Sequence, residues 1–172
     1  PKHLESIIAK LKETGVTVEE YDDSVRIFMD KRPGKCNIKT MPHPGFPTDM
    51  QPQFATLLAI SEGTSIVTEG VWDSRFRYAD QLTFMGANIQ VDGKSAVITG
   101  VEGLTAAEVK ANDLRAGAAM IIAGLIAEGV TEIEDIEYID RGYEQVVEKF
   151  SQLGADIKRV TIAEDPTMRI AN

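Results

Sequence analysis

The chain has 172 residues, of which 18 are basic and 27 acidic, so its formal net charge is -9. A chain of this length can bury a substantial core, and its acidic balance argues against electrostatic capture of nucleic acid or of an anionic membrane. One cysteine, Cys36, excludes an intrachain disulfide, and with only two histidines beside it we expect no metal site. No apolar segment is long enough to span a bilayer and the start carries no signal-peptide pattern, so we expect a cytoplasmic protein.

The first predicted elements are a helix and a hairpin. Apolar residues recur at helical spacing over residues 3–11, and this pattern ends at Thr14-Gly15. Alternating segments at residues 18–21 and 25–29 fit the two arms of a β-hairpin. Because the helical pattern begins at Pro1 without a methionine, we expect the chain to be a fragment of a longer protein.

A proline-rich stretch, residues 42–54, leads into a second helix that is expected to end at Glu62. Thr48 and Gln51 have the spacing of a capping box, although a proline that follows them also fits a slightly later helix start. Whichever of the two positions starts the helix, Asp49 lies near its N-terminus, where the helix dipole stabilises an acid. Asp49 is therefore either a structural first-turn carboxylate or a general base that nearby arginines keep ionised.

An internal repeat follows from two Glu-Gly pairs. Glu62-Gly63 and Glu128-Gly129 each close an apolar helix, and each precedes an arginine, Arg75 or Arg141, by the same interval. After the first arginine come an amphipathic helix and a hairpin over residues 89–99 with an Asp-Gly turn. Copies of roughly 65 to 70 residues with mixed elements favour packed α/β units over a helical solenoid. The chain thus holds two fuller copies and one incomplete copy at its start.

Three arginines, Arg75, Arg115 and Arg141, each follow residues suited to cap a helix, so we expect all three in the first turns of helices. The candidate caps are, in order, Asp73 or Ser74, Asn112 or Asp113, and Asp140. A cation in a first turn is disfavoured by roughly 0.3 to 1 kcal/mol unless something negative joins it. The arginines then either pair with their caps on the surface or share an anionic ligand, since guanidinium geometry suits a carboxylate or a phosphate.

Two further residues that often carry chemistry are given structural roles. His43 lies between two prolines and is expected to serve the turn. Cys36 lies in a strand-like alternation and is expected to be a small buried hydrophobe rather than a nucleophile.

Four stretches together carry a family resemblance. They are residues 42–51, residues 68–69 with 75–76, residues 113–116 and residues 139–144. In this order and at these spacings they closely resemble the UDP-N-acetylglucosamine 1-carboxyvinyltransferases, the enolpyruvyl transferases of bacterial peptidoglycan and cell wall synthesis. The likeness leaves out only the tail after Val160. The related shikimate-pathway enolpyruvyl transferase shares the architecture but does not carry the Pro-Thr-Asp-Met-Gln stretch in this form.

The resemblance implies an α/β (α+β) fold in which βαβαββ units form two globular domains, an inside-out α/β barrel arrangement with substrates bound in the cleft between them. Family members are much longer than this chain. Residues 1–172 would therefore be the C-terminal part, with about two and a half repeats, and the N-terminal domain would be absent.

The resemblance also implies a reaction without a cofactor or a metal. The enolpyruvyl group of phosphoenolpyruvate is transferred to the 3-hydroxyl of UDP-N-acetylglucosamine, and phosphate is released. Asp49 matches the family aspartate proposed as the base for that hydroxyl, and Val71 matches a position whose backbone contacts the nucleotide sugar. The family's phosphate-side lysine and its mobile-loop cysteine would lie in the absent domain, and Cys36 does not match that cysteine.

The remaining expected site residues lie on the phosphoenolpyruvate side of the cleft or support that side. Arg75, Arg115 and Arg141 match arginines on the phosphoenolpyruvate side of the cleft. Arg141 is expected to face the carboxylate of phosphoenolpyruvate, and Asp113 matches a carboxylate that helps to organise the site.

Because the site would be shared across a cleft, we expect the fragment alone to be inactive and to bind either substrate poorly. Three alternatives stay open: a stand-alone module that binds a phosphorylated or carboxylated metabolite, the shikimate-pathway enzyme, and a structural repeat whose arginines only pair with their caps. Tight binding by the chain unaided would favour the module. A change in stability but not in ligand response on Arg115→Ala would favour the structural repeat.

Overall fold

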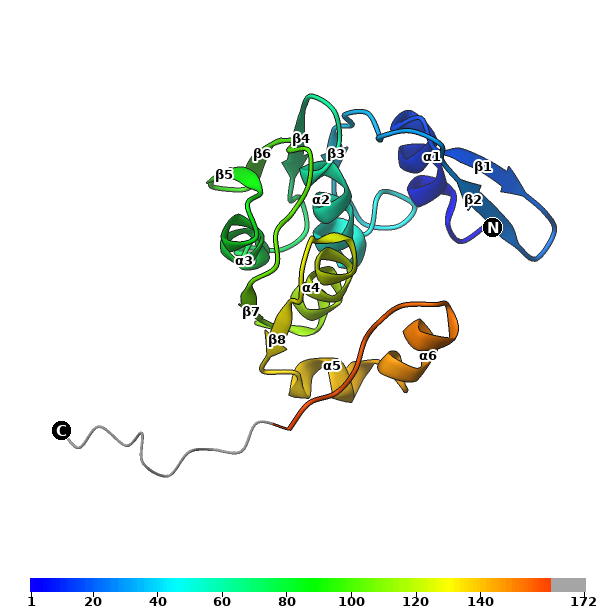
Figure 1. Cartoon of the computed structure of the whole chain (residues 1–172). Helices are drawn as coiled ribbons and strands as arrows, with labels where there is room; N and C mark the ends of the chain where they lie inside the picture. The colour runs from blue at the N-terminus through cyan, green and yellow to red at the C-terminus, as the bar shows by residue number, and fades with distance from the viewer. Residues whose placement is uncertain (162–172) are drawn as a thin grey trace.

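The structure is a computed structural model that describes residues 1–161 (Figure 1). The predicted C-terminal region also includes residues 162–172, which lie outside the described residues. Within residues 1–161, no helix combines the length and the apolar character needed to cross a membrane.

The centre of the chain folds as one βαβαββ unit. Its elements are β3 (Ile38–Lys39), α2 (Gln51–Ala59), β4 (Thr64–Thr68), α3 (Tyr78–Phe84), β5 (Asn88–Asp92) and β6 (Ser95–Thr99). The strands form a sheet in the order β3-β4-β6-β5, in which β3 and β4 are parallel and the other pairs are antiparallel. The predicted second hairpin is therefore confirmed, with Gly93 at a positive φ of 56° in its turn.

One face of this sheet is buried and the other is open. In the β4–β6 pair Ser65 lies opposite Ile98 and Val67 opposite Ala96, and all four residues are buried. The next residue along β4, Ile66, is 44% exposed because side chains alternate across a strand. The buried face joins the core formed with α2, α3 and α4, while the helices leave the other face uncovered (Figure 1).

The second copy of the repeat begins in the same order. The parallel strands β7 (Glu108–Lys110) and β8 (Glu132–Glu134) flank α4 (Leu114–Ile126), and α5 (Glu137–Gly142) and α6 (Val146–Gln152) follow. Helix α4 packs against α2, and its buried small residues Ala116, Ala119 and Ala123 belong to the same core cluster as α2. Residues 153–161 contain no strand, so this copy has no hairpin within the described part of the chain.

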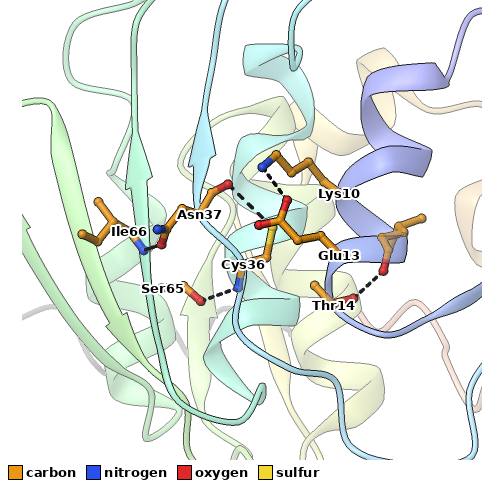
Figure 2. A network of polar contacts seen from close by, with 8 residues as sticks. Lys10, Glu13, Thr14, Cys36, Asn37, Ser65 and Ile66 are labelled. Atoms are coloured by element: carbon orange, nitrogen blue, oxygen red, sulfur yellow. Dashed lines mark hydrogen bonds and ion pairs between the residues drawn. The ribbon is translucent and has the colours of Figure 1, made fainter.

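The first copy contributes α1 (Glu5–Glu13) and a confirmed hairpin of β1 (Thr17–Glu20) with β2 (Val25–Phe28). Figure 2 shows the contacts where α1 meets the central unit. Lys10 and Glu13 form an ion pair at 2.7 Å beside Cys36, whose backbone N–H donates to Ser65 Oγ at 3.1 Å. Cys36 is 2% exposed and burial raises the pKa of its thiol to about 12, so the prediction of a small buried hydrophobe is confirmed.

Candidate functional site

The N-terminal ends of two helices meet at a charged pair. The 3-10 turn η1 (Thr48–Met50) leads directly into α2, and its Asp49 carboxylate accepts a bond from Nε of Arg115 in α4, although the two residues are 66 positions apart in the chain. The packing of α2 against α4 brings these ends together. The bond to Asp49 raises the pKa of the Arg115 guanidinium. Asp49 stays 60% exposed on its side chain, so a solvent-borne group can reach the carboxylate.

The first turn of α4 is capped as predicted. Asp113 has extended backbone angles, and its Oδ1 accepts bonds from the N–H groups of Arg115 at 2.8 Å and Ala116 at 2.9 Å. Asp113, rather than Asn112, is therefore the N-cap, and Arg115 lies in the first turn. The two carboxylates of Asp113 and Asp49 provide the negative charge that this placement of an arginine requires.

The predicted capping box at the entrance of α2 is wrong. Neither η1 nor α2 has a side-chain cap bond, and both polar atoms of the Gln51 amide are buried without a partner. The Thr48 hydroxyl instead donates to Oε2 of Glu69 at 3.0 Å. A buried carboxylate is a stronger acceptor than a carboxamide and cannot be left without donors, so it draws the hydroxyl away from the helix.

Glu69, directly after β4, is the centre of a buried polar network. Its side chain is 1% exposed, and its Oε1 accepts bonds from the Thr40 hydroxyl at 2.7 Å and from the backbone N–H groups of Val71 and Trp72 at 2.9 and 3.0 Å. The carboxylate therefore ties the turn that carries Asp49 to the loop that follows β4. Sequence reasoning assigned no role to Glu69, although an acid directly after an apolar strand was a usable signal.

Arg75 lies outside α3, so the prediction that it occupies a first helical turn is wrong. Residues 71–77 form a loop that ends in a turn at residues 75–77, Ser74 has a positive φ of 57°, and α3 starts only at Tyr78. The bonds of Glu69 hold the backbone of Val71 and Trp72 at the start of this loop, so that these residues do not continue into a helix. The Arg75 guanidinium lies 5.7 Å from the Trp72 ring centre, and its Nε is buried without a partner. Val71 is 40% exposed at the loop surface.

Arg141 is also not in a first turn. It lies in the last turn of α5, with its guanidinium 5.6 Å from the ring centre of Tyr138, and it forms no ion pair within residues 1–161. Asp140 is not the N-cap, because α5 already begins at Glu137. The Asp140 carboxylate pairs with Arg159, which lowers its pKa.

Helix α5 nevertheless rests on the first turn of α4. A Cβ added at Gly142 would collide with Leu114, and one at Gly117 would collide with Ile139. These close approaches hold the helix that bears Arg141 beside the turn that bears Arg115.

Tyr143, which sequence reasoning also missed, follows α5 in the same region. Burial raises the pKa of its hydroxyl, with Arg115 acting in the opposite direction and Asp49 and Asp113 adding to the rise. A phenol is thus close to the charged pair. Tyr143 lies in one of the four stretches that carry the family resemblance, but its place beside the charged pair depends on how α5 docks.

The arrangement can bind an anion and accept a proton. Arg115 offers a guanidinium at a helix N-terminus, and Asp49 offers an exposed carboxylate on a rigid turn. Cys36 lies in the contact with α1 rather than in this group, and His43 lines a shallow hollow with His3. Among residues 1–161, no group of three or more His, Cys, Asp or Glu side chains is arranged to hold a metal ion.

Curated relatives match most of this chain. A UDP-N-acetylglucosamine 1-carboxyvinyltransferase 2 of Clostridium acetobutylicum is 59% identical over 94% of the chain and 39% of its own length. A UDP-N-acetylglucosamine 1-carboxyvinyltransferase 3 of Caldanaerobacter subterraneus is 57% identical over 93% of the chain and 38% of its own length. The chain therefore spans about two-fifths of the length of these relatives.

Solved structures agree on the fold, which is of the α/β enolpyruvyl transferase type. The enolpyruvyl transferase NikO from Streptomyces tendae has a TM-score of 0.83 and 31% identity, with 90% of this chain and 36% of that chain covered. An EPSP synthase from Acinetobacter baumannii has a TM-score of 0.58 at 21% identity, with 75% of this chain and 31% of that chain covered, and so supports the fold alone. The family model described as EPSP synthase (3-phosphoshikimate 1-carboxyvinyltransferase) matches residues 1–150. The chain therefore belongs to this family of carboxyvinyl, or enolpyruvyl, transferases.

Proposed function

We propose that this chain supplies one wall of the active site of a UDP-N-acetylglucosamine 1-carboxyvinyltransferase. The whole protein would transfer the enolpyruvyl group of phosphoenolpyruvate to the 3-hydroxyl of UDP-N-acetylglucosamine and release phosphate. The observation that carries the proposal is the exposed Asp49 carboxylate held by Arg115 where η1 meets the start of α4. The names and the 57% and 59% identities of the two bacterial relatives support this substrate pair over the shikimate-pathway alternative.

In this proposal Asp49 accepts the proton of the sugar 3-hydroxyl. The hydroxyl oxygen then forms a bond to C2 of phosphoenolpyruvate while C3 takes up a proton from an acid supplied by the rest of the protein. Collapse of the resulting tetrahedral adduct breaks the C2–O bond to phosphate and returns a proton from C3, which restores the double bond. A carboxylate on a rigid turn suits the first transfer because its position is set before the substrate arrives.

In this proposal the remaining predicted site residues bind the substrates or orient the residues that do. Arg75, Arg115 and Arg141 would bind the carboxylate and phosphate of phosphoenolpyruvate, with Arg141 on the carboxylate, because guanidinium groups form paired bonds to such anions. The Val71 backbone would contact the nucleotide sugar. Asp113 would orient Arg115 by holding the first turn of α4.

The proposed partners are the two substrates and an N-terminal domain that closes the cleft, with the complete protein in the cytoplasm. A chimera tests this reading: the present segment replaces the matching part of the Clostridium acetobutylicum relative, and phosphate release is measured with both substrates. We expect an active chimera. We also expect Asp49→Ala and Arg115→Ala to lower kcat by about 100-fold or more, the scale of losing a group that acts in the transition state.

The matched control is Arg26→Ala, which removes an arginine from an exposed ion pair with Glu19 in the hairpin. It should leave activity unchanged. An inactive chimera, or full activity in Asp49→Ala and Arg115→Ala, would contradict the proposal. Tight binding of phosphoenolpyruvate by the isolated chain in calorimetry would instead favour a stand-alone anion-binding module.

A further inference from the structure

Glu69 contacts two segments that the proposed function uses for different tasks. One oxygen accepts the Thr48 hydroxyl, and Thr48 directly precedes Asp49, the proposed base. The other oxygen accepts the N–H groups of Val71 and Trp72, in the loop proposed to contact the nucleotide sugar. The carboxylate itself is 1% exposed.

We propose that Glu69 is a positioning residue that holds the proposed base and the nucleotide-sugar loop at a set separation. This inference rests on the proposed function of the chain. Glu69 does not reach solvent, so it acts through the backbone and hydroxyl groups that it binds rather than on a substrate.

The bonds of Glu69 leave little freedom to either segment. Its Oε1 accepts three donors, and the third is the Thr40 hydroxyl at 2.7 Å. That hydroxyl in turn accepts the N–H of Gly70 at 2.8 Å. The loop is therefore bound to Glu69 directly through Val71 and Trp72, and indirectly through Gly70 and the Thr40 hydroxyl. A Cβ at Gly70 would collide with the carbonyl oxygen of Thr40, the residue directly after β3, which shows how closely the loop approaches this segment.

The chemistry of a buried carboxylate makes this link strong. A desolvated carboxylate must keep its donors, and bonds to a charged acceptor are roughly twice as strong as neutral ones. The turn that carries Asp49 and the loop that carries Val71 are therefore both bound to the same carboxylate. If each were held by its own neutral hydrogen-bond partner, each could shift without the other. A shift of about 1 Å in a reacting group can lower the rate about 100-fold, so a link of this kind affects the reaction without touching it.

The test uses the active chimera and a pair of substitutions at Thr48. Thr48→Val keeps the shape and removes the donor, whereas Thr48→Ser keeps the hydroxyl. We expect Thr48→Val to lower kcat by about tenfold or more while the KM for the nucleotide sugar stays within about twofold, and Thr48→Ser to keep wild-type kcat. Glu69→Gln, which loosens both segments, should lower kcat and raise that KM.

The control for a general loss of buried bonding is Ser65→Ala. Ser65 lies in β4, the strand that Glu69 follows, is 1% exposed and accepts the Cys36 N–H, and it makes no side-chain hydrogen bond to either segment. It should lower the melting temperature as much as Thr48→Val does while leaving kcat and KM unchanged. Equal kcat values for Thr48→Val and Thr48→Ser would overturn the inference. So would a fall in kcat for Ser65→Ala as large as that for Thr48→Val.

Amide hydrogen exchange gives a readout that does not depend on turnover. Glu69→Gln should speed exchange both at Val71 and Trp72 and at Met50, whose N–H bonds to Pro47 within the turn. Faster exchange in one segment alone would overturn the link. An inactive unmutated chimera with exchange that rises in both segments would count against the proposed function and still support Glu69 as the positioning residue.

Discussion

Replacing Asp113 with alanine removes the N-cap of the most buried helix in the second copy of the repeat. The Asp113 carboxylate accepts two backbone N–H bonds, at 2.8 and 2.9 Å, that the helix cannot satisfy internally. Helix α4 buries Ala116, Ala119 and Met120 in the main core, so fraying of its first turn disturbs packing as well as local structure. Asp113→Asn is the informative companion, because asparagine caps about as well as aspartate but carries no charge.

Loss of an N-cap to alanine costs about 0.5 to 2 kcal/mol. Asp113 makes two cap bonds and is only partly exposed, so we place Asp113→Ala at the upper end, about 1 to 2 kcal/mol. For a chain of this size 1 kcal/mol corresponds to a melting temperature shift of roughly 2 to 4 °C. Asp113→Asn should lose only the charge on the helix dipole, about 0.3 to 1 kcal/mol.

The assay is urea unfolding followed by circular dichroism, in parallel with thermal melts. Asp80→Ala is the control, since Asp80 lies in the first turn of α3, a helix that has no side-chain cap bond. It should change the free energy of unfolding by less than about 0.5 kcal/mol. If Asp113→Asn destabilised the chain as much as Asp113→Ala, the charge rather than the bonds would account for the effect, and the capping argument would be refuted.

Three further predictions concern Gly70 in the loop after β4, the Asp49–Arg115 pair and the Cys36 thiol. Gly70→Ala should destabilise the chain by about 1 to 3 kcal/mol because its methyl group meets the Thr40 carbonyl, whereas Gly103→Ala, where a Cβ meets no atom within 4 Å, should be nearly neutral in the same unfolding assay. A double-mutant cycle between Asp49 and Arg115 should give a coupling below about 1 kcal/mol in stability, since both side chains remain partly exposed to solvent, and a larger coupling would mean that the pair is structural. Burial raises the Cys36 pKa from 9.0 to about 12, so the folded state holds the thiol proton more tightly and stability falls as pH rises from 9 toward 12. Cys36→Ala should remove that part of the pH dependence, and an unchanged profile would show that other groups cause it.

Local patterns in the sequence predicted the elements and their repeat. Both hairpins lie where alternation and turn residues placed them. The predicted helix ends are less accurate, because α2 ends at Ala59 and α4 at Ile126, ahead of the Glu-Gly pairs. Asp113 as an N-cap was also readable, because a cap bonds to residues only two or three positions away. Such features depend on spacing along the chain, and spacing is what a sequence states directly.

The tertiary structure alone decided which polar groups meet. Thr48 and Gln51 had the spacing of a local cap, yet the Thr48 hydroxyl bonds to Glu69, because a buried carboxylate brought close by the sheet competes for every nearby donor. The same carboxylate binds the backbone of the loop before α3, and Arg75 lies in this loop rather than in the predicted first turn of the helix. The sequence by itself therefore determined the elements, their repeat and the family, whereas the partners of the buried charge, and with them the geometry of the candidate site, depend on contacts between residues far apart in the chain.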